Sequence, residues 1–375
     1  MARYASDHDR ACLPDLGIGA DPLQLFTEGD RLYNAMLIDI GKARSDISLV
    51  CYIFGDDPVG WRFAEALAER VKAGVTVRVQ LDAVGTPPVW SRKLRAYLSQ
   101  HSIELRYFHR WQWRDPFRFN RRDHRKLLVV DSDVAYLGGF NIHQESSRTY
   151  YDDERWLDAH VRFEGYLARW ARSIIEAVWW PRHTASPPPS NDGLRPSALV
   201  PTSSPGCRQQ LRWAYLDLFR RARKRLYLAT PYFVPDPVTR RSLMTCAERG
   251  VDVHVLLPAV SDVPLARWAA RAEYGRLLEA GVRVFEYGPR LLHTKAVVAD
   301  GAYASVGTAN LDVRSFFLNE ELNLFTRSLD FCHTLEAHLL ACESEAAEVD
   351  LGQWQKRGRL SRVAESAAWL LRYWL

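Results

Sequence analysis

The chain has 375 residues, of which 47% are hydrophobic and 25% charged, and its formal net charge is +5. This composition is typical of a soluble globular protein and excludes a largely disordered chain. The length allows two or three ordinary domains. The modest positive charge favours anionic partners (phosphate esters, nucleic acid or acidic lipid surfaces) without choosing among them.

Targeting signals and cysteines bear on the location of the protein. Residues 1–17 contain no apolar region of a signal peptide. No apolar run approaches the ~20 residues that a transmembrane helix needs. The six cysteines form no C-x-x-C pair, and Cys51 and Cys246 lie in apolar or helical patterns, which suits a reducing compartment. We therefore expect a cytoplasmic protein whose contact with any membrane is peripheral.

The first part of the chain is repeated in the second. Segments 48–54, 73–83 and 102–108 resemble segments 226–233, 249–259 and 281–287. Each copy reads as strand, amphipathic helix, strand, helix and strand, which predicts an α/β fold of two similar halves, each a mixed sheet flanked by helices. The Pro- and Ser-rich stretch 181–206 is expected to form no regular element. We place the first half at 1–182, the connection at 183–206 and the second half at 207–375.

A six-point pattern, H-x-K-x4-D-x6-G-[GT]-x-N, closes each copy. Its members are His124, Lys126, Asp131, Gly138, Gly139 and Asn141, and then His293, Lys295, Asp300, Gly307, Thr308 and Asn310, each 169 residues from its partner. Internal repetition without a slip in spacing indicates duplication. It predicts one active site assembled from two equivalent halves about a pseudo-twofold axis.

The residue types of the pattern suit the binding of a phosphate. The apolar segments 127–130 and 296–299 read as central strands buried on both faces. Residues i and i+2 of a strand share a face, so each histidine should point the same way as its lysine. The lysines would neutralise phosphate oxygens, while Asn141, Asn310 and the hydroxyl of Thr308 would donate hydrogen bonds.

Two histidines suit a two-step displacement, in which one attacks phosphorus and the other serves as acid and then base. The second nitrogen of each ring needs an acceptor. Glu321 is the candidate in the second copy, and Asp158 is its counterpart in the first copy, with Asp152 as the competing choice. Asp131 and Asp300, which close the motif strands, are expected to be structural.

With these residues in view, the chain resembles the phospholipase D superfamily. Segments 124–142, 230–236 and 310–323 are similar to those of bacterial cardiolipin synthases, of the short type without transmembrane helices. Gly139 and Thr308 occupy a position that is often Ser in that family, and the first half has no Glu that matches Glu321. The resemblance covers the chain from about residue 28 to its end.

The resemblance implies phosphatidyl transfer that needs neither a metal nor another cofactor. One phosphatidylglycerol would donate its phosphatidyl group through a phosphohistidine, and a second would accept it, giving cardiolipin and glycerol. His124 would be the nucleophile and His293 the acid and base, within a catalytic set formed by His124, Lys126, Asp131, His293, Lys295 and Asp300. The sequence by itself does not separate the two histidine roles.

Other functions remain open at this point. The same site could hydrolyse lipid to phosphatidic acid, or act as a phosphodiesterase on nucleic acid, which we favour less. A last alternative, which is not an enzyme, is a catalytically silent protein that binds membranes.

Two segments are candidates for contact with anionic phospholipids at a peripheral membrane surface. Segment 106–122 interleaves arginines with aromatic residues and leads into His124. This suits a membrane lip, a segment at the entrance of the site that faces the cytoplasmic side of the bacterial inner membrane. Segment 360–375 has apolar residues on one helical face. This helix could lie in the membrane interface or pack against protein. The sequence does not indicate an oligomeric state.

Overall fold

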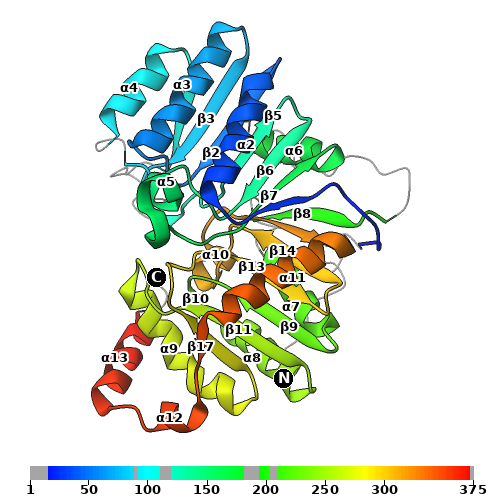
Figure 1. Ribbon diagram of the computed structural model, residues 1–375, viewed down its shortest axis with the longest axis vertical. Coiled ribbons are helices and arrows are strands. Elements are labelled where there is room, and N and C mark those ends of the chain that lie inside the picture. The colour runs from blue at the N-terminus through cyan, green and yellow to red at the C-terminus, as the bar shows by residue number, and fades with distance from the viewer. Residues whose placement is uncertain (1–15, 88–90, 110–119, 181–193, 203–208, 372–375) are drawn as a thin grey trace.

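Each copy of the sequence repeat folds into a mixed β-sheet with helices on its faces, and the two units are stacked along the long axis of the molecule (Figure 1). The computed structural model describes residues 16–87, 91–109, 120–180, 194–202 and 209–371. The predicted α/β architecture of two similar halves is confirmed.

The first half contains a seven-stranded sheet with the order β1-β7-β6-β5-β2-β3-β4. Strands β2, β3 and β4 are parallel, and β5, β6, β7 and β1 continue the sheet in antiparallel pairs. The strands are β1 (Gln24–Phe26), β2 (Asp46–Cys51), β3 (Thr76–Asp82), β4 (Glu104–Phe108), β5 (Leu127–Val130), β6 (Val134–Gly138) and β7 (His160–Glu164). The helices are α2 (Gly29–Lys42), α3 (Pro58–Lys72), α4 (Arg92–Gln100), α5 (Arg148–Tyr151) and α6 (Tyr166–Trp179), with the 3-10 turns η2 (Gln144–Ser146) and η3 (Asp152–Glu154).

The second half repeats this order in an eight-stranded sheet, β17-β12-β11-β9-β13-β14-β16-β8. Its strands are β8 (Ser197–Pro201), β9 (Arg225–Ala229), β11 (Asp252–Pro258), β12 (Arg283–Tyr287), β13 (Ala296–Ala299), β14 (Tyr303–Gly307), β16 (Leu322–Thr326) and β17 (Ala346–Glu348), with a separate pair β10 (Phe233–Val234) and β15 (Leu311–Asp312). Its helices are α7 (Gln210–Arg221), α8 (Pro237–Glu248), α9 (Pro264–Glu279), α10 (Val313–Phe317), α11 (Leu329–Ser344), α12 (Leu351–Gln355) and α13 (Arg359–Leu370). Apart from the extra edge strand β17, each strand of the eight-stranded sheet has a counterpart at the same place in the first sheet.

Two corresponding helices begin in the same way, which supports the repeat of the structure. Helices α3 and α8 each follow an Asp-Pro pair, in which the aspartate is the N-cap and the proline is the first helical residue. Asp57 accepts from the backbone N–H of Gly60, and Asp236 accepts from that of Val238. Both devices satisfy N–H groups that the first helical turn leaves without partners.

The closing aspartates of the two motifs are structural, as their place at the strand ends predicted, so the catalytic set that the resemblance implied was wrong to include Asp131 and Asp300. Asp131 accepts hydrogen bonds from the backbone N–H groups of residues 44–46 at 2.7–2.9 Å, just before β2. Asp300 does the same for residues 223–225 before β9, at 2.8–2.9 Å. Each aspartate has a positive φ and ties the end of its motif strand to the start of the neighbouring strand.

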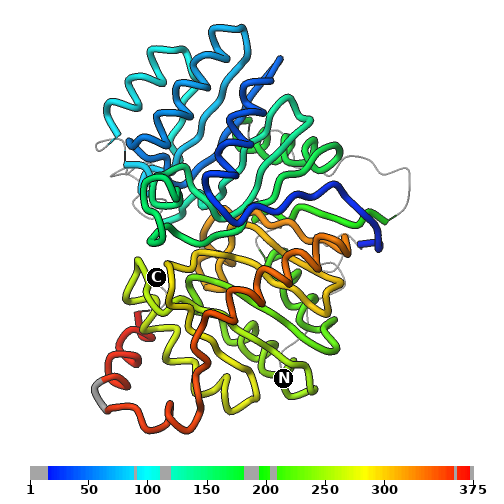
Figure 2. The backbone as a smooth tube through the Cα atoms, in the orientation of Figure 1, coloured from blue at the N-terminus to red at the C-terminus, as the bar shows by residue number. Residues whose placement is uncertain are grey.

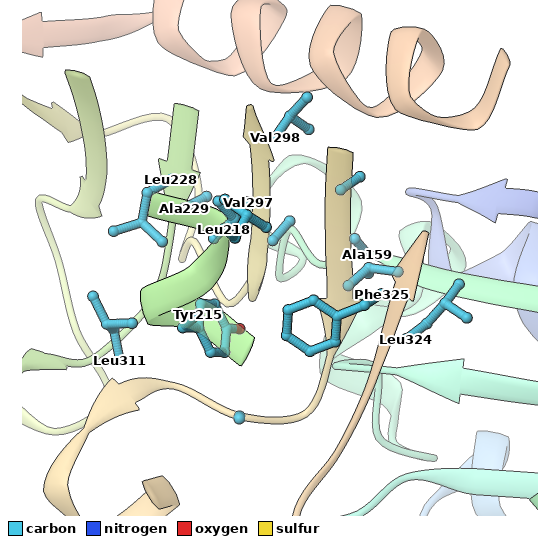
Figure 3. Packing of buried hydrophobic residues seen from close by; sticks show 14 of the residues in the cluster. Ala159, Tyr215, Leu218, Leu228, Ala229, Val297, Val298, Leu311, Leu324 and Phe325 are labelled. Atoms are coloured by element: carbon cyan, nitrogen blue, oxygen red, sulfur yellow. The ribbon is translucent and has the colours of Figure 1, made fainter. Parts of the chain in front are cut away.

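One hydrophobic core extends across both halves. Ala159, which precedes β7, lies in the same cluster as Leu324 and Phe325 of β16 and Tyr215 of α7 (Figure 3). Helix α6 of the first half contacts β8 of the second, and α11 of the second half contacts β1 of the first. The halves therefore share apolar packing as well as an active site.

The connection between the halves is more ordered than its composition predicted. Residues 197–201 form β8, which pairs with β16 at the edge of the second sheet, so the expectation that 181–206 forms no regular element was wrong there. The apolar run within Ser197–Pro201 is buried, and this burial outweighs the surrounding Pro and Ser residues. Residues 181–193 and 203–208 lie outside the described part of the chain.

Candidate active site

Each motif histidine is held by a backbone hydrogen bond from the opposite half. The N–H of His124 donates to the carbonyl of Glu320 at 2.9 Å, and the N–H of His293 donates to the carbonyl of Leu157 at 2.7 Å. The histidines and lysines lie in extended segments just before β5 and β13, not within these strands as expected. These cross-half bonds replace the strand ladder at this point and bring the two motifs together.

The carboxylates beside the histidines are exchanged between the halves. His124 Nδ1 is 3.1 Å from both carboxylate oxygens of Glu321, and His293 Nδ1 is 2.5 Å from Asp158 Oδ2. The expected pairing within each copy was therefore wrong. The physical reason lies in the backbone, because each carboxylate follows directly after the residue that accepts the N–H of the opposite histidine.

Glu321 is surrounded by donors from its own half. The hydroxyl of Thr308 donates to Oε2 at 2.6 Å, and that of Ser315 donates to Oε1 at 2.9 Å. The single proton of the Thr308 hydroxyl is thus directed to Glu321, and not to the phosphate as the sequence analysis expected. Glu321 lies fully buried, so these donors and His124 satisfy a carboxylate that water does not reach.

Asp158 occupies the space that a side chain at position 139 would need. A Cβ added to Gly139 would overlap the Asp158 carboxylate. Asp158 accepts from the backbone N–H of Ala159 at 2.8 Å and lies 3.7 Å from the ammonium of Lys295. The competing candidate, Asp152, is exposed beside Arg148 and does not reach either histidine. The absence of Ser at 139 is therefore matched by the position of Asp158.

Burial controls the charges of the motif lysines. It lowers the pKa of Lys126 to about 8 and that of Lys295 to about 7, against the opposing attraction of the nearby carboxylates. The Lys126 ammonium donates to the carbonyl of His124 at 2.8 Å, and Lys295 Nζ is 2.7 Å from His293 Nδ1. The charge of Lys126 also lowers the pKa of Lys295, so the two ammonium groups repel each other and a bound anion would stabilise both.

Burial also lowers the pKa of both motif histidines. For His124 the nearby Glu321 opposes this effect, whereas for His293 the charge of Lys295 adds to it and holds the pKa well below the usual value. The charge of Lys126 in the first half also lowers the pKa of His293. The two motifs thus belong to a single electrostatic environment, as the duplication predicted.

The motif asparagines are buried at the same site. Asn141 Oδ1 accepts from the backbone N–H of Ile53 at 3.1 Å, which fixes its amide orientation. Asn310 Oδ1 is buried without a hydrogen-bond partner among the described residues. An unpaired buried amide at a functional site is a point at which a ligand can bind.

Three aromatic residues that the sequence analysis did not single out surround the histidines. The ring of Tyr52 is edge-on to His124 at 5.0 Å between centroids, and that of Tyr232 is edge-on to His293 at 6.5 Å. Trp156 lies 5.1 Å from His293. The sequence signal for the tyrosines was their matching place in the repeated segments 48–54 and 226–233. Trp156 lies two residues before Asp158, and nothing in the repeated pattern marked it.

The described arginines of the expected membrane lip bind within the protein. Arg106 lies over the ring of Trp179, Arg121 pairs with Glu320 at 2.5 Å, and Arg122 pairs with Asp82 at 3.3 Å. Residues 110–119, which carry the remaining arginines and aromatics of that segment, lie outside the described part of the chain. Among the helices described, none combines the length and apolar character needed to cross a bilayer.

A fold of two phospholipase D-like halves and a site with paired histidines and lysines define the class of protein. The profile of the family "Cardiolipin synthase, PLD-like domain" matches residues 36–171 and 215–342. The chain belongs to this family. The predicted membership of the phospholipase D superfamily is therefore confirmed, and with it the class of phosphatidyltransferases.

Curated relatives carry the same family name. The chain is 31% identical over 360 residues to a cardiolipin synthase of Clostridium perfringens strain SM101, a match that covers 92% of this chain and 75% of the relative. It is 33% identical over 372 residues to cardiolipin synthase A of Escherichia coli O157:H7, covering 93% of this chain and 74% of the relative.

Solved structures share the fold at low sequence identity. Phosphatidylserine synthase of Haemophilus influenzae superposes with a TM-score of 0.72 at 15% identity, over 98% of this chain and 99% of that one. Polyphosphate kinase of Porphyromonas gingivalis gives a TM-score of 0.61 at 13% identity, over 88% of this chain and 49% of that one. Both confirm the two-half architecture.

Proposed function

We propose that the protein transfers a phosphatidyl group between phospholipids through a phosphohistidine, making cardiolipin and glycerol from two molecules of phosphatidylglycerol. The observation that carries this proposal is the convergence of His124, Lys126, His293 and Lys295 at one buried site, each histidine backed by a carboxylate. The names of the curated relatives support the same substrate class.

In the first step the phosphodiester binds between Lys126 and Lys295. Its negative charge favours the protonated lysines, which in turn stabilise the charge that develops on the phosphoryl oxygens. His124 donates its Nδ1–H to Glu321, which leaves the Nε2 lone pair free to attack phosphorus. The N–P bond forms, the bond from phosphorus to the glycerol oxygen breaks, and His293 gives its Nε2 proton to the departing alkoxide.

In the second step the flow of protons is reversed. A hydroxyl of a second phosphatidylglycerol gives its proton to His293 and attacks phosphorus, and the bond to His124 breaks. His293 ends this step protonated, as it began the first, so the pair of steps needs no outside acid, base or metal.

The carboxylates support different roles for the two histidines. Asp158 makes the shorter contact, 2.5 Å to His293, whereas Glu321 is 3.1 Å from His124 and shares its charge with the Thr308 and Ser315 hydroxyls. A carboxylate with fewer other donors stabilises an imidazolium more strongly, and a phosphodiester bound at Lys295 would offset the positive charge that lowers the pKa of His293. With substrate bound, this supports His293 as the acid and His124 as the nucleophile, in agreement with the family pattern.

The proposed substrate also bears on location. Phosphatidylglycerol resides in a bilayer, so the enzyme would act at a membrane surface, and we place it on the cytoplasmic side. Four described cysteines, Cys51, Cys246, Cys332 and Cys342, are free thiols, which supports a reducing compartment.

Incubation of the purified protein with phosphatidylglycerol vesicles, followed by separation of the lipids, tests the proposal. We expect cardiolipin and glycerol in equal amounts, and none from His124→Ala or His293→Ala. Phosphatidic acid without cardiolipin would assign the same site to hydrolysis. Cleavage of single-stranded DNA without lipid turnover would overturn the lipid assignment.

A further inference from the structure

Helix α13 packs on the body of the protein through Ala368, Trp369 and Glu365. Ala368 is buried in a cluster with Ala269 of α9 and Val234 of β10. Glu365 is also buried, bound by Arg357 at 3.0 Å and 3.9 Å from Arg271. Since position 365 lies beside 271 and position 368 beside 269, α13 runs antiparallel to α9, along the outer edge of the second half (Figure 2).

The apolar face of α13 points away from the protein. Val363 is 66% exposed, Leu370 75% and Leu371 46%. The sequence analysis left open whether this face packs on protein or on a membrane, and no described residue of the chain covers it. Each aliphatic side chain left in water forgoes about 25 cal/mol per Å² of apolar area. Exposed apolar residues gathered on one helix face are typical of a surface that contacts a partner.

The exposed apolar surface continues onto the segment that reaches the active site. Because the helices are antiparallel, the end of α13 lies beside the start of α9, where Leu265 is 37% exposed and Val260, just before the helix, is 64% exposed. Between these two residues, Asp262 accepts a hydrogen bond from the Tyr232 hydroxyl at 2.7 Å. The ring of Tyr232 is edge-on to His293. One short segment thus joins the apolar surface to the motif histidine.

The charges around this surface favour an anionic partner. Lys356 and Arg362 are exposed beside this surface. Glu365, the acidic residue of α13, is buried and paired with Arg357, so that pair contributes little net charge to the surface. Apolar side chains flanked by arginine and lysine are typical of helices that lie in the interface of an anionic bilayer.

We propose that Val260, Leu265, Val363, Leu370 and Leu371 form a docking surface for a bilayer that contains anionic phospholipid. The inference deepens the proposed function, because a lipid substrate would have to leave such a bilayer to reach His293. Docking through this surface sets Asp262 and Tyr232 at the boundary between membrane and active site. The substrate can then move from the bilayer to the lysines over a short path.

Vesicle sedimentation with the full chain tests the docking surface without reference to turnover. Vesicles of equal parts phosphatidylglycerol and phosphatidylcholine are compared with vesicles of phosphatidylcholine alone. We expect Val363→Ser/Leu370→Ser to bind the anionic vesicles at least about tenfold more weakly than wild type, since each lost aliphatic contact is worth about 1–2 kcal/mol and 1.4 kcal/mol is tenfold. Arg362→Gln should weaken binding less and reduce its dependence on salt.

The matched control is Ile38→Ser/Leu340→Ser, which removes two similarly exposed aliphatic residues from α2 and α11. We expect it to bind like wild type. Equal loss in both double variants, or no loss in either, would overturn the proposal. So would a wild-type dimer in analytical ultracentrifugation that Val363→Ser/Leu370→Ser converts to a monomer, because the surface would then be an interface between copies of the chain.

Activity in two forms of substrate separates this inference from the proposed function. With phosphatidylglycerol dispersed in detergent micelles, Val363→Ser/Leu370→Ser should match wild type, and with vesicles it should be slower by the same factor as its binding. Normal vesicle binding without turnover in either form would contradict the proposed function and leave the docking surface supported. Equal loss in micelles and vesicles would contradict the docking role.

Discussion

At each motif histidine, the residue that sets the imidazole tautomer comes from the other half of the chain. Glu321 accepts from His124 and Asp158 accepts from His293. The consequence is specific, because a carboxylate that orients an imidazole affects the chemical step of that imidazole. Loss of a carboxylate should therefore have the same effect as loss of the histidine across the interface.

We expect Glu321→Gln to behave like His124→Ala and Asp158→Asn to behave like His293→Ala. Each amide should lower kcat by about 10³-fold, since the wrong tautomer is favoured. A phosphatidyl ester of p-nitrophenol, whose leaving group needs no proton, distinguishes the pairs. It should restore the first, burst step in Asp158→Asn and His293→Ala but not in Glu321→Gln. Restoration in Glu321→Gln instead would show that pairing within each half governs catalysis.

The lowered lysine pKa values predict that anion binding takes up protons. Burial lowers the pKa of Lys126 to about 8 and that of Lys295 to about 7, so at pH 8 Lys295 is mostly neutral. A bound phosphodiester favours both ammonium groups and raises both pKa values. Titration calorimetry with glycerophosphoglycerol at pH 8, in two buffers of different ionisation enthalpy, should show uptake of about one proton. The His124→Ala background prevents turnover during the titration.

Lowering the pH to 6 supplies the control for this prediction. Both lysines are then already protonated, so their share of the uptake should vanish. Lys295→Met should reduce the uptake at pH 8 by removing the group with the lower pKa. Identical apparent enthalpies in the two buffers at pH 8 would contradict the idea that these lysines are partly neutral before the anion binds.

At the level of elements, the residue that follows β6 differs from the residue that follows β14, and this difference determines how much space a neighbouring carboxylate has. Gly139 after β6 leaves space for the Asp158 carboxylate, whereas the hydroxyl of Thr308 after β14 donates a hydrogen bond to the Glu321 carboxylate. The residue at this position therefore matches the carboxylate of its own half: Gly139 accompanies Asp158, and Thr308 accompanies Glu321.

We expect Gly139→Ser to reduce activity by about 100-fold. The added side chain would displace Asp158 and with it His293, and a misplacement of about 1 Å is enough for a loss of this size. Overpacking should also lower the free energy of unfolding by about 1–3 kcal/mol. Thr308→Ser keeps the hydroxyl that Glu321 needs and is expected to remain close to wild type. Full activity in Gly139→Ser would contradict the steric role, and kcat together with urea denaturation measures both effects.

Across the whole molecule, the halves are joined by the shared core, by the two histidine hydrogen bonds and by ion pairs. Glu28 near β1 binds Arg155 of its own half at 2.8 Å and lies 3.4 Å from Arg290 of the second. This cluster is partly exposed, so we assign it a small share of the stability. The apolar contacts of α6 with β8 and of α11 with β1 contribute more.

A shared core predicts a single cooperative unfolding transition for both halves. Circular dichroism and tryptophan fluorescence should give coincident urea curves, because exposure of one half uncovers apolar residues of the other. Ala159→Asp, which places an unpaired charge in the core that both halves contribute to, should shift both curves together. Two separate transitions would show that the halves fold independently.

Local sequence patterns determine much of the fold and of the active site of this protein. Alternating apolar segments and helices gave the two α/β halves, and 127–130 and 296–299 match β5 and β13 because a strand buried on both faces must be continuously apolar. The duplicated spacing identified the histidines, lysines and asparagines, since residue types needed for phosphate chemistry stand out in a repeat. Asp131 and Asp300 were recognised as structural from their place at the ends of strands.

Only the tertiary structure decided which groups face each other across the two halves. The crossed carboxylates, the hydroxyl of Thr308 bound to Glu321, the aromatic rings beside the histidines and the outward apolar face of α13 depend on contacts between residues distant in sequence. Spacing along a chain constrains neighbours on one strand or helix. It does not determine how two similar halves meet, because that depends on the packing of both surfaces at once.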